Sequence, residues 1–162
     1  MARQTRQAGE DAIFAPTPPL EALRSVISYA ATDFPGRPVH VRDPESERRT
    51  QISAIDISRA YFNASIDDDA GSTYVMLPPE HPGHAEGKCG KLKKHMYGTR
   101  AAADGWQQEY SSFLRSVGFR QGAASPCVFV HREKGIAMSV HGDDFTTAGP
   151  KCELDWFETT LK

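Results

Sequence analysis

The stretch SVHGDDF (residues 139–145) constrains the fold more than any other part of the chain. A Gly-Asp pair stands between two runs that alternate apolar with small or polar residues, which is typical of antiparallel strands joined by a tight turn. The stretch therefore predicts an antiparallel sheet with Asp143 and Asp144 at a hairpin tip. Gly-Asp pairs are also favoured in such turns for purely local reasons, so the two acids alone do not indicate a catalytic site.

The composition is that of an ordinary globular domain. The chain has 162 residues, of which 39% are hydrophobic and 25% charged, enough for one domain with a sizeable core. Three cysteines without a CxxC pair predict neither a disulfide framework nor a zinc site. Because the sequence contains no run of about 18 apolar residues and no signal-peptide segment, we expect a soluble intracellular protein without a membrane partner, in the cytoplasm or nucleus.

The charge is unevenly distributed along the chain. The net charge of −2 by itself gives little reason to expect a nucleic-acid partner. Residues 87–103, however, contain no Asp or Glu and carry five cations: Lys88, Lys91, Lys93, Lys94 and Arg100. Such a basic stripe is compatible with phosphate binding. On charge alone, a solvated face balanced by the acids at residues 67–69 is the simpler interpretation.

The remaining patterns predict an α+β domain. Apolar spacing and end signals indicate helices over about residues 18–31 and 101–119, with Gly118 at the end of the second, and a third helix begins near residue 153. Strands are expected in the segments 51–56, 72–80, 87–98, 126–132, 135–140 and 145–149, and a short one at 39–41. This order predicts an antiparallel sheet with helices on one face.

Asp56 stands where the strand at residues 51–56, expected to be buried on both faces, would end. In the predicted sheet this strand end and the hairpin tip can lie side by side, so Asp56, Asp143 and Asp144 would converge. Three carboxylates repel one another unless a cation holds them, and Mg²⁺ takes oxygen ligands of this kind. Two such ions about 3.5–4 Å apart would support phosphoryl or nucleotidyl transfer. We expect the carboxylates of Asp56 and Asp143 within about 6 Å of each other.

Several segments, taken together and in order, resemble the reverse transcriptase domain of copia-type LTR retrotransposons. IDISRAYFNASIDDDAGSTYVMLPPEHP, which contains Asp56, resembles the first catalytic motif of that family. The run that starts at Gly87 is similar in its Lys-Leu-Lys-Lys, Tyr-Gly, Trp, Phe-Leu, Gly-Phe and Pro-Cys-Val-Phe landmarks. SVHGDDFTTAG falls where the family has its paired-Asp box, and IFAPTPPLEALRSVISYAA resembles the helix before the first motif.

The resemblance implies an RNA-directed DNA polymerase with a palm-like antiparallel sheet backed by helices, partial fingers and no thumb. It places a polar tail at residues 1–12 and the polymerase domain, truncated at its C-terminus, at residues 13–162. The implied partners are an RNA or DNA template with primer, deoxynucleoside triphosphates and the rest of a retrotransposon polyprotein.

The resemblance also implies roles for individual residues. Asp56, Asp143 and Asp144 would be catalytic acids and ligands of Mg²⁺ or Mn²⁺. Tyr61, five residues after Asp56, would exclude a ribose 2′-OH, although a core or rim aromatic is the alternative. The template–primer backbone would be contacted by Lys91, Lys93, Lys94 and Arg100.

Departures from the family pattern leave the activity of this chain open. His141 and Gly142 precede the paired acids where the family commonly has Tyr-Val, and residues 101–103 are Ala where it has Gln-Ala-Pro. The expected basic strand is reduced to Arg3 and Arg6, and the sequence ends inside the last predicted helix. One alternative is therefore a catalytically silent palm remnant that binds nucleic acid or only folds. A metal-dependent phosphatase or nuclease is another, but no further acidic or His cluster supports it.

Overall fold

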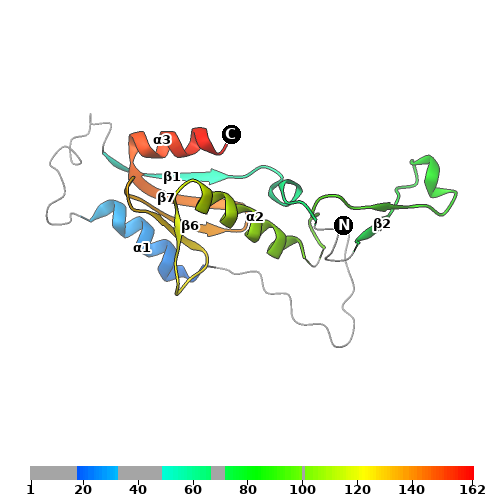
Figure 1. Ribbon diagram of the computed structural model, residues 1–162, viewed down its shortest axis with the longest axis horizontal. Coiled ribbons are helices and arrows are strands. Elements are labelled where there is room, and N and C mark those ends of the chain that lie inside the picture. The colour runs from blue at the N-terminus through cyan, green and yellow to red at the C-terminus, as the bar shows by residue number, and fades with distance from the viewer. Residues whose placement is uncertain (1–17, 33–48, 67–71, 100) are drawn as a thin grey trace. The chain divides into compact units, whose positions relative to one another are not determined.

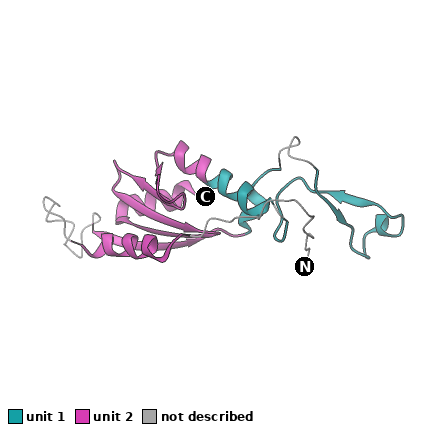
Figure 2. Cartoon of the chain, turned by 90° about the horizontal axis from the view of Figure 1, so that it is seen from below, with its two compact units in different colours: residues 1–15, 59–110 teal, residues 16–58, 111–162 magenta. Residues whose placement is uncertain are grey.

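The computed structural model describes residues 18–32, 49–66, 72–99 and 101–162, and the chain divides into two compact units (Figures 1 and 2). Unit 1 comprises residues 1–15 and 59–110, and unit 2 comprises residues 16–58 and 111–162. Several features named from the sequence lie outside the described residues: the tail at 1–12 with Arg3 and Arg6, the strand expected at 39–41, the acids at 67–69, and Arg100.

Unit 2 is built on a five-stranded antiparallel sheet with the strand order β1-β7-β6-β5-β4. Its strands are β1 (Thr50–Asp56), β4 (Arg120–Gln121), β5 (Val128–His131), β6 (Ile136–His141) and β7 (Asp144–Pro150). The predicted α+β class and antiparallel sheet are confirmed, and only β4 has no counterpart among the predicted strands.

The three α-helices lie where the apolar spacing predicts them: α1 (Leu20–Ala31), α2 (Ala102–Ser116) and α3 (Lys151–Thr160). The end of α2 shows why Gly118 is a useful signal. Gly118 has a φ of +99°, and its N–H donates to the carbonyl of Arg115 at 3.2 Å. The N–H of Phe119 donates to the carbonyl of Leu114 at 2.9 Å, which completes a Schellman motif.

Helices α1 and α3 lie on opposite faces of this sheet (Figure 1). Ser53 of β1 reaches α3, where its Oγ donates to Glu158 Oε1 at 2.7 Å. The next residue, Ala54, points to the other face and lines a cavity together with Leu23 of α1. The prediction that helices cover only one face is therefore wrong. The second face carries small side chains such as Ala54 and Ala148, which leave room for an amphipathic helix.

β1 forms an edge of the sheet, since β7 is its only strand neighbour among the described residues. Ile52 is consequently 49% exposed, and the expectation of a strand buried on both faces is wrong. The core of unit 2 is formed instead by side chains from the inner strands, α2 and α3. Those that are almost fully buried include Leu114, Phe129, Ile136, Met138, Val140, Phe145 and Phe157.

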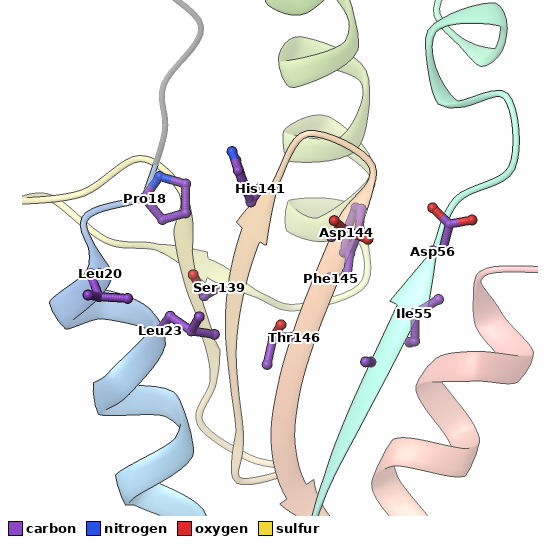
Figure 3. A pocket seen from close by; sticks show the side chains of 11 residues that line it. Pro18, Leu20, Leu23, Ile55, Asp56, Ser139, His141, Asp144, Phe145 and Thr146 are labelled. Atoms are coloured by element: carbon purple, nitrogen blue, oxygen red, sulfur yellow. The ribbon is translucent and has the colours of Figure 1, made fainter.

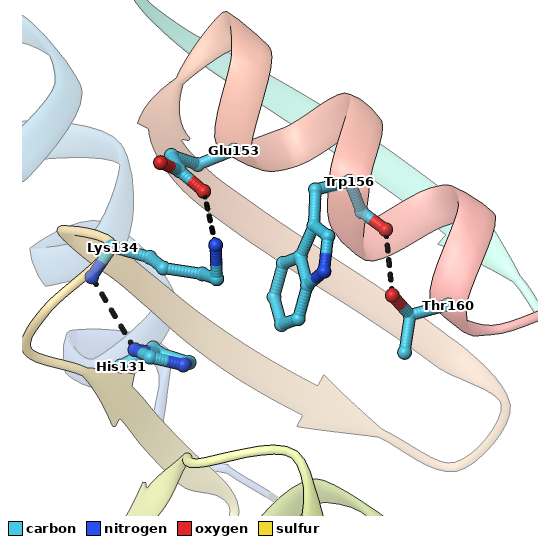
Figure 4. A network of polar contacts seen from close by, with 5 residues as sticks. All are labelled: His131, Lys134, Glu153, Trp156 and Thr160. Atoms are coloured by element: carbon cyan, nitrogen blue, oxygen red, sulfur yellow. Dashed lines mark hydrogen bonds and ion pairs between the residues drawn. The ribbon is translucent and has the colours of Figure 1, made fainter.

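Lys134, in the turn between β5 and β6, anchors α3 to the sheet (Figure 4). Its Nζ forms an ion pair with Glu153 Oε2 at 2.6 Å and lies 4.1 Å from the ring centroid of Trp156. The backbone N–H of Lys134 donates to Nδ1 of buried His131 at 3.3 Å. The His131 ring in turn packs edge-on against Trp156 and Phe119. One lysine thus combines charge pairing, a cation–π contact and turn formation.

In unit 1 the predicted strand segments 72–80 and 87–98 contain β2 (Tyr74–Met76) and β3 (Cys89–Lys91), which pair as a two-stranded antiparallel sheet. Two 3₁₀ helices, η2 (Ala60–Asn63) and η4 (Pro82–His84), accompany it. No helix in the described part of the chain is long and apolar enough to cross a membrane. Cys89, Cys127 and Cys152 form no disulfide bond, and burial raises the pKa of the Cys127 thiol.

Buried His95 lies directly against α2 in unit 1. Its N–H donates to the carbonyl of Ala64 at 3.0 Å, and its ring faces Gly105. A Cβ atom on Gly105 would come within 2.1 Å of His95 Nε2, so the buried His95 ring would have to move to make room. Glycine is therefore required at this helical position for close packing rather than for backbone freedom.

We expect Gly105→Ala to lower the free energy of unfolding by about 1–3 kcal/mol, because the methyl group overpacks the His95 site. Helix propensity alone acts in the opposite direction, by about 1 kcal/mol. Urea unfolding followed by circular dichroism measures the difference. Ser112→Ala, on an exposed position of the same helix, is the control that adds propensity without a clash. A Gly105→Ala protein as stable as the parent would contradict the packing described here.

Candidate active site

The pairing of β1 with β7 brings Asp56 to the tip of the β6–β7 hairpin. The register runs from Thr50 opposite Pro150 to Asp56 opposite Asp144. Beyond the last pair, the N–H of Ile57 donates to the carbonyl of Asp143 at 3.0 Å. The predicted meeting of this strand end with the hairpin tip is confirmed.

A two-residue turn, formed by Gly142 and Asp143, places the acids. Gly142 has a φ of +64° and is the only one of the two with a positive φ, as in a type II′ turn. A Cβ atom on Gly142 would meet nothing within 4 Å, so the backbone conformation, not space, favours glycine. The Gly at this position, a departure from the family pattern, is thus accounted for by the turn itself.

Asp56 and Asp144 point to the same face of the sheet, because directly opposed residues on neighbouring strands share a face. Figure 3 shows both side chains at the same end of the sheet. Both residues are exposed, and Asp143 is half-buried. None of the three carboxylates forms a hydrogen bond or an ion pair within the described residues. No positively charged side chain among the described residues therefore compensates the negative charge of these three acids.

These oxygen atoms are the donor type that hard divalent cations prefer, so the chemistry of the three acids fits Mg²⁺ or Mn²⁺. Across residues 18–32, 49–66, 72–99 and 101–162, however, no group of three or more His, Cys, Asp or Glu side chains is arranged to hold a metal ion. Two acids share a face, and Asp143 adjoins them through its backbone. The separation of the Asp56 and Asp143 carboxylates stays a prediction.

A cavity of about 460 Å³ lies beside Asp56 and Asp144, on the face covered by α1 (Figure 3). Apolar side chains of α1 form one wall, and the ends of β1, β6 and β7 form the other. A volume of this size suits a small organic ligand. The sequence pattern does not reveal this cavity, because it does not indicate on which face α1 packs. The lining residues are Pro18, Leu20, Leu23, Ala54, Ile55, Asp56, Ser139, His141, Asp144, Phe145 and Thr146.

The remaining candidate residues belong to unit 1. The half-buried ring of Tyr61 packs edge-on against Tyr97, with ring centroids 4.3 Å apart at an interplanar angle of 80°. Lys91 and Lys93 are exposed. Lys94 Nζ donates to the carbonyl of Asn63 and to the hydroxyl of Ser65, at 3.0 Å in each case, so this lysine also joins two segments of unit 1.

When the sequence is compared with known protein families, almost the whole chain matches a single family. Residues 3–162 match the family described as reverse transcriptase (RNA-dependent DNA polymerase). A retrovirus-related Pol polyprotein from transposon TNT 1-94 of Nicotiana tabacum is 25% identical over 86% of this chain and 9% of its own length. One from transposon RE1 of Arabidopsis thaliana is 29% identical over 64% of this chain and 7% of its own length. The chain thus spans less than a tenth of these relatives. No solved structure gives a significant match.

Asp144→Asn should raise the free energy of unfolding in EDTA by up to about 1 kcal/mol, because like charges directly opposite each other on a sheet are destabilising. Urea unfolding measures this change. Asp155→Asn, which removes an acid paired with Lys151 at 2.7 Å in α3, is the matched control and should not stabilise the protein. Equal or lower stability of the Asp144 variant would show that the acids do not repel each other appreciably.

Proposed function

Because the chain belongs to the reverse transcriptase (RNA-dependent DNA polymerase) family, we propose that it is the polymerase domain of a copia-type retrotransposon Pol polyprotein, adding deoxynucleotides to a primer 3′-OH. The family predicted from the sequence is confirmed by the match over residues 3–162. The observation that carries the proposal is the placement of Asp56 opposite Asp144, next to the turn that holds Asp143.

In this proposal unit 2 is the palm and unit 1 supplies part of the fingers, with no thumb within residues 13–162. An antiparallel sheet with acids at the ends of two adjacent strands supports the palm assignment. Helices α2 and α3, together with the apolar core that they form with the inner strands, hold these strand ends in place. The acids themselves need to contribute nothing to stability.

Asp56 and Asp143 are the proposed metal-bridging acids, and Asp144 is the adjacent acid. Two divalent cations bound there would stabilise the attacking and leaving oxygens of nucleotidyl transfer. Among the described residues no cation pairs with the three carboxylates, which supports this assignment, since a bound metal ion would relieve their repulsion. The β1–β7 register would orient the carboxylates toward the primer end.

Tyr61 is the proposed residue that excludes a ribose 2′-OH. Steric exclusion requires a ring that does not move aside, and the edge-on contact with Tyr97 supports such rigidity. Phe62 contacts the same Tyr97 ring at a centroid distance of 5.8 Å. The three aromatic side chains thus form a small cluster within unit 1.

The proposed substrates are deoxynucleoside triphosphates and a primed RNA or DNA template. Lys91, Lys93, Lys94 and Arg100 are proposed to contact the template–primer backbone, and the sequence around them contains no acid. The relatives are Pol polyproteins, so we propose that other segments of such a polyprotein are partners of this domain inside the cell.

A catalytically silent remnant of the same fold is the second candidate. Two observations favour it: His141 and three successive alanines at residues 101–103 replace family residues, and the described residues contain no ready-made group of three metal-ligating side chains. These changes would affect the positioning of the primer 3′-OH and the triphosphate, and a misplacement of the reacting groups by about 1 Å can reduce the rate about a hundredfold.

We expect the 162-residue chain to bind Mn²⁺ in an Asp143-dependent manner but to extend primers only weakly. Isothermal titration with Mn²⁺ and primer extension on an RNA template measure the two properties separately. Asp143→Asn should abolish both, whereas Asp155→Asn should change neither. Loss of extension without loss of metal binding in the Asp143 variant would exclude the proposed role of that acid. No Asp143-dependent binding and no extension would support the silent remnant.

A separate prediction concerns sugar selection. Tyr61→Ala should raise the ratio of ribonucleotide to deoxynucleotide incorporation by an order of magnitude or more. The reason is that the loss of one steric contact removes about 1.4 kcal/mol of discrimination, which corresponds to a factor of about ten. Competing single-nucleotide incorporation under Mn²⁺ measures the ratio. Tyr61→Phe keeps the ring and should retain the parent ratio. If Tyr61→Ala also retains it, Tyr61 is only a packing residue.

A further inference from the structure

One face of the β2–β3 sheet presents exposed aromatic, apolar and basic side chains. Tyr74 lies opposite Lys91, and Met76 lies opposite Cys89, so these four residues share a face, here called the ribbon face. Tyr74 is 59% exposed and Met76 81% exposed. The alternating residues point the other way, where a Cβ atom on Gly90 would contact Leu77 and Val75. The large side chains therefore lie on the side that the described residues of unit 1 leave exposed.

The segment that carries β3, residues 87–99, is basic. Residues 87–99 include no Asp or Glu. Lys93, two residues after Lys91, is exposed, and its side chain forms no hydrogen bond or ion pair with any described residue. The acids in the β2–β3 connection are Glu80 and Glu86, and Glu86 is paired with Lys88. A negatively charged ligand is thus favoured at this face over a cationic one.

We propose that the ribbon face binds an unpaired nucleic-acid strand, with a base stacked on the ring of Tyr74 and the backbone phosphates near Lys91 and Lys93. Exposed aromatic rings beside lysines are the composition of single-strand binding surfaces, where stacking tolerates any base. The identification of this strand as the unpaired part of the template rests on the proposed function. The binding itself uses none of the acids of unit 2.

A second copy of the chain is a less suitable occupant. A stable dimer interface buries roughly 800 Å² on each partner, and two large apolar side chains fall well short of this area. A two-fold interface would also bring two copies of the same basic surface together, which is unfavourable.

The test is fluorescence anisotropy with a labelled single-stranded oligo(dT), in EDTA and without nucleotides. Tyr74→Ala should weaken binding by about tenfold, the loss expected for one stacked base. Tyr74→Phe, which keeps the ring, should bind like the parent. Lys91→Met should lower affinity and reduce the slope of log affinity against log salt by about 0.7, the value for one single-strand phosphate. Val130→Ser, at an exposed apolar position of unit 2, is the matched control and should have no effect.

Unchanged binding in Tyr74→Ala, or equal loss in the Phe and Ala variants, would overturn the stacking proposal. A concentration-dependent dimer in light scattering that Tyr74→Ala abolishes would assign the ribbon face to a protein contact and overturn it as well. These results are independent of the polymerase assays. If primer extension depends on Asp143 but oligo(dT) binding does not depend on Tyr74, the proposed function stands and this inference is refuted. If oligo(dT) binding depends on Tyr74 but primer extension does not depend on Asp143, this inference stands and the proposed function is refuted.

Discussion

The antiparallel pairing of β1 with β7 is the interaction on which the rest of unit 2 depends. It joins a strand that ends at Asp56 to the hairpin that carries Asp143 and Asp144. Because side chains alternate along a strand, a slip of one residue would turn Asp56 to the opposite face. The register is secured by Thr147, whose Oγ1 donates to the carbonyl of Ser53 at 3.1 Å, and by buried Phe145 opposite Ile55.

The large buried side chains and the two opposed acids lie on different faces of this sheet. The face toward α3 contributes the large buried side chains, and Lys134 ties α3 to it through Glu153 and Trp156. The face toward α1 has small side chains, the cavity, and Asp56 and Asp144, whose carboxylates have no partner among the described residues. Repulsion between acids is tolerated because a core that does not involve them maintains the strands.

The parts that could be predicted from the sequence are those encoded in a few neighbouring residues. The turn at Gly142 and the end of α2 at Gly118 both require a positive φ, and glycine signals this directly. β1 lies at the edge of the sheet because no second strand pairs with it among the described residues, and the sequence of β1 does not indicate this. For the same reason the face chosen by α1, the cavity and the exposure of Tyr74 needed the tertiary structure. Asp56 was predictable as a candidate because its strand end and the hairpin tip can lie side by side in the predicted antiparallel sheet.

The distance along the chain between β1 and β7 also determines when this sheet can be completed. β6, β7 and their turn are local and can form quickly once synthesised. β1 is made early, yet its partner residues follow only after residues 57–143 have emerged. At typical synthesis rates this delay is on the order of ten seconds. During that time β1 has two unpaired edges and an apolar Ile52, so on the ribosome it is open to pairing with other strands until β7 is made.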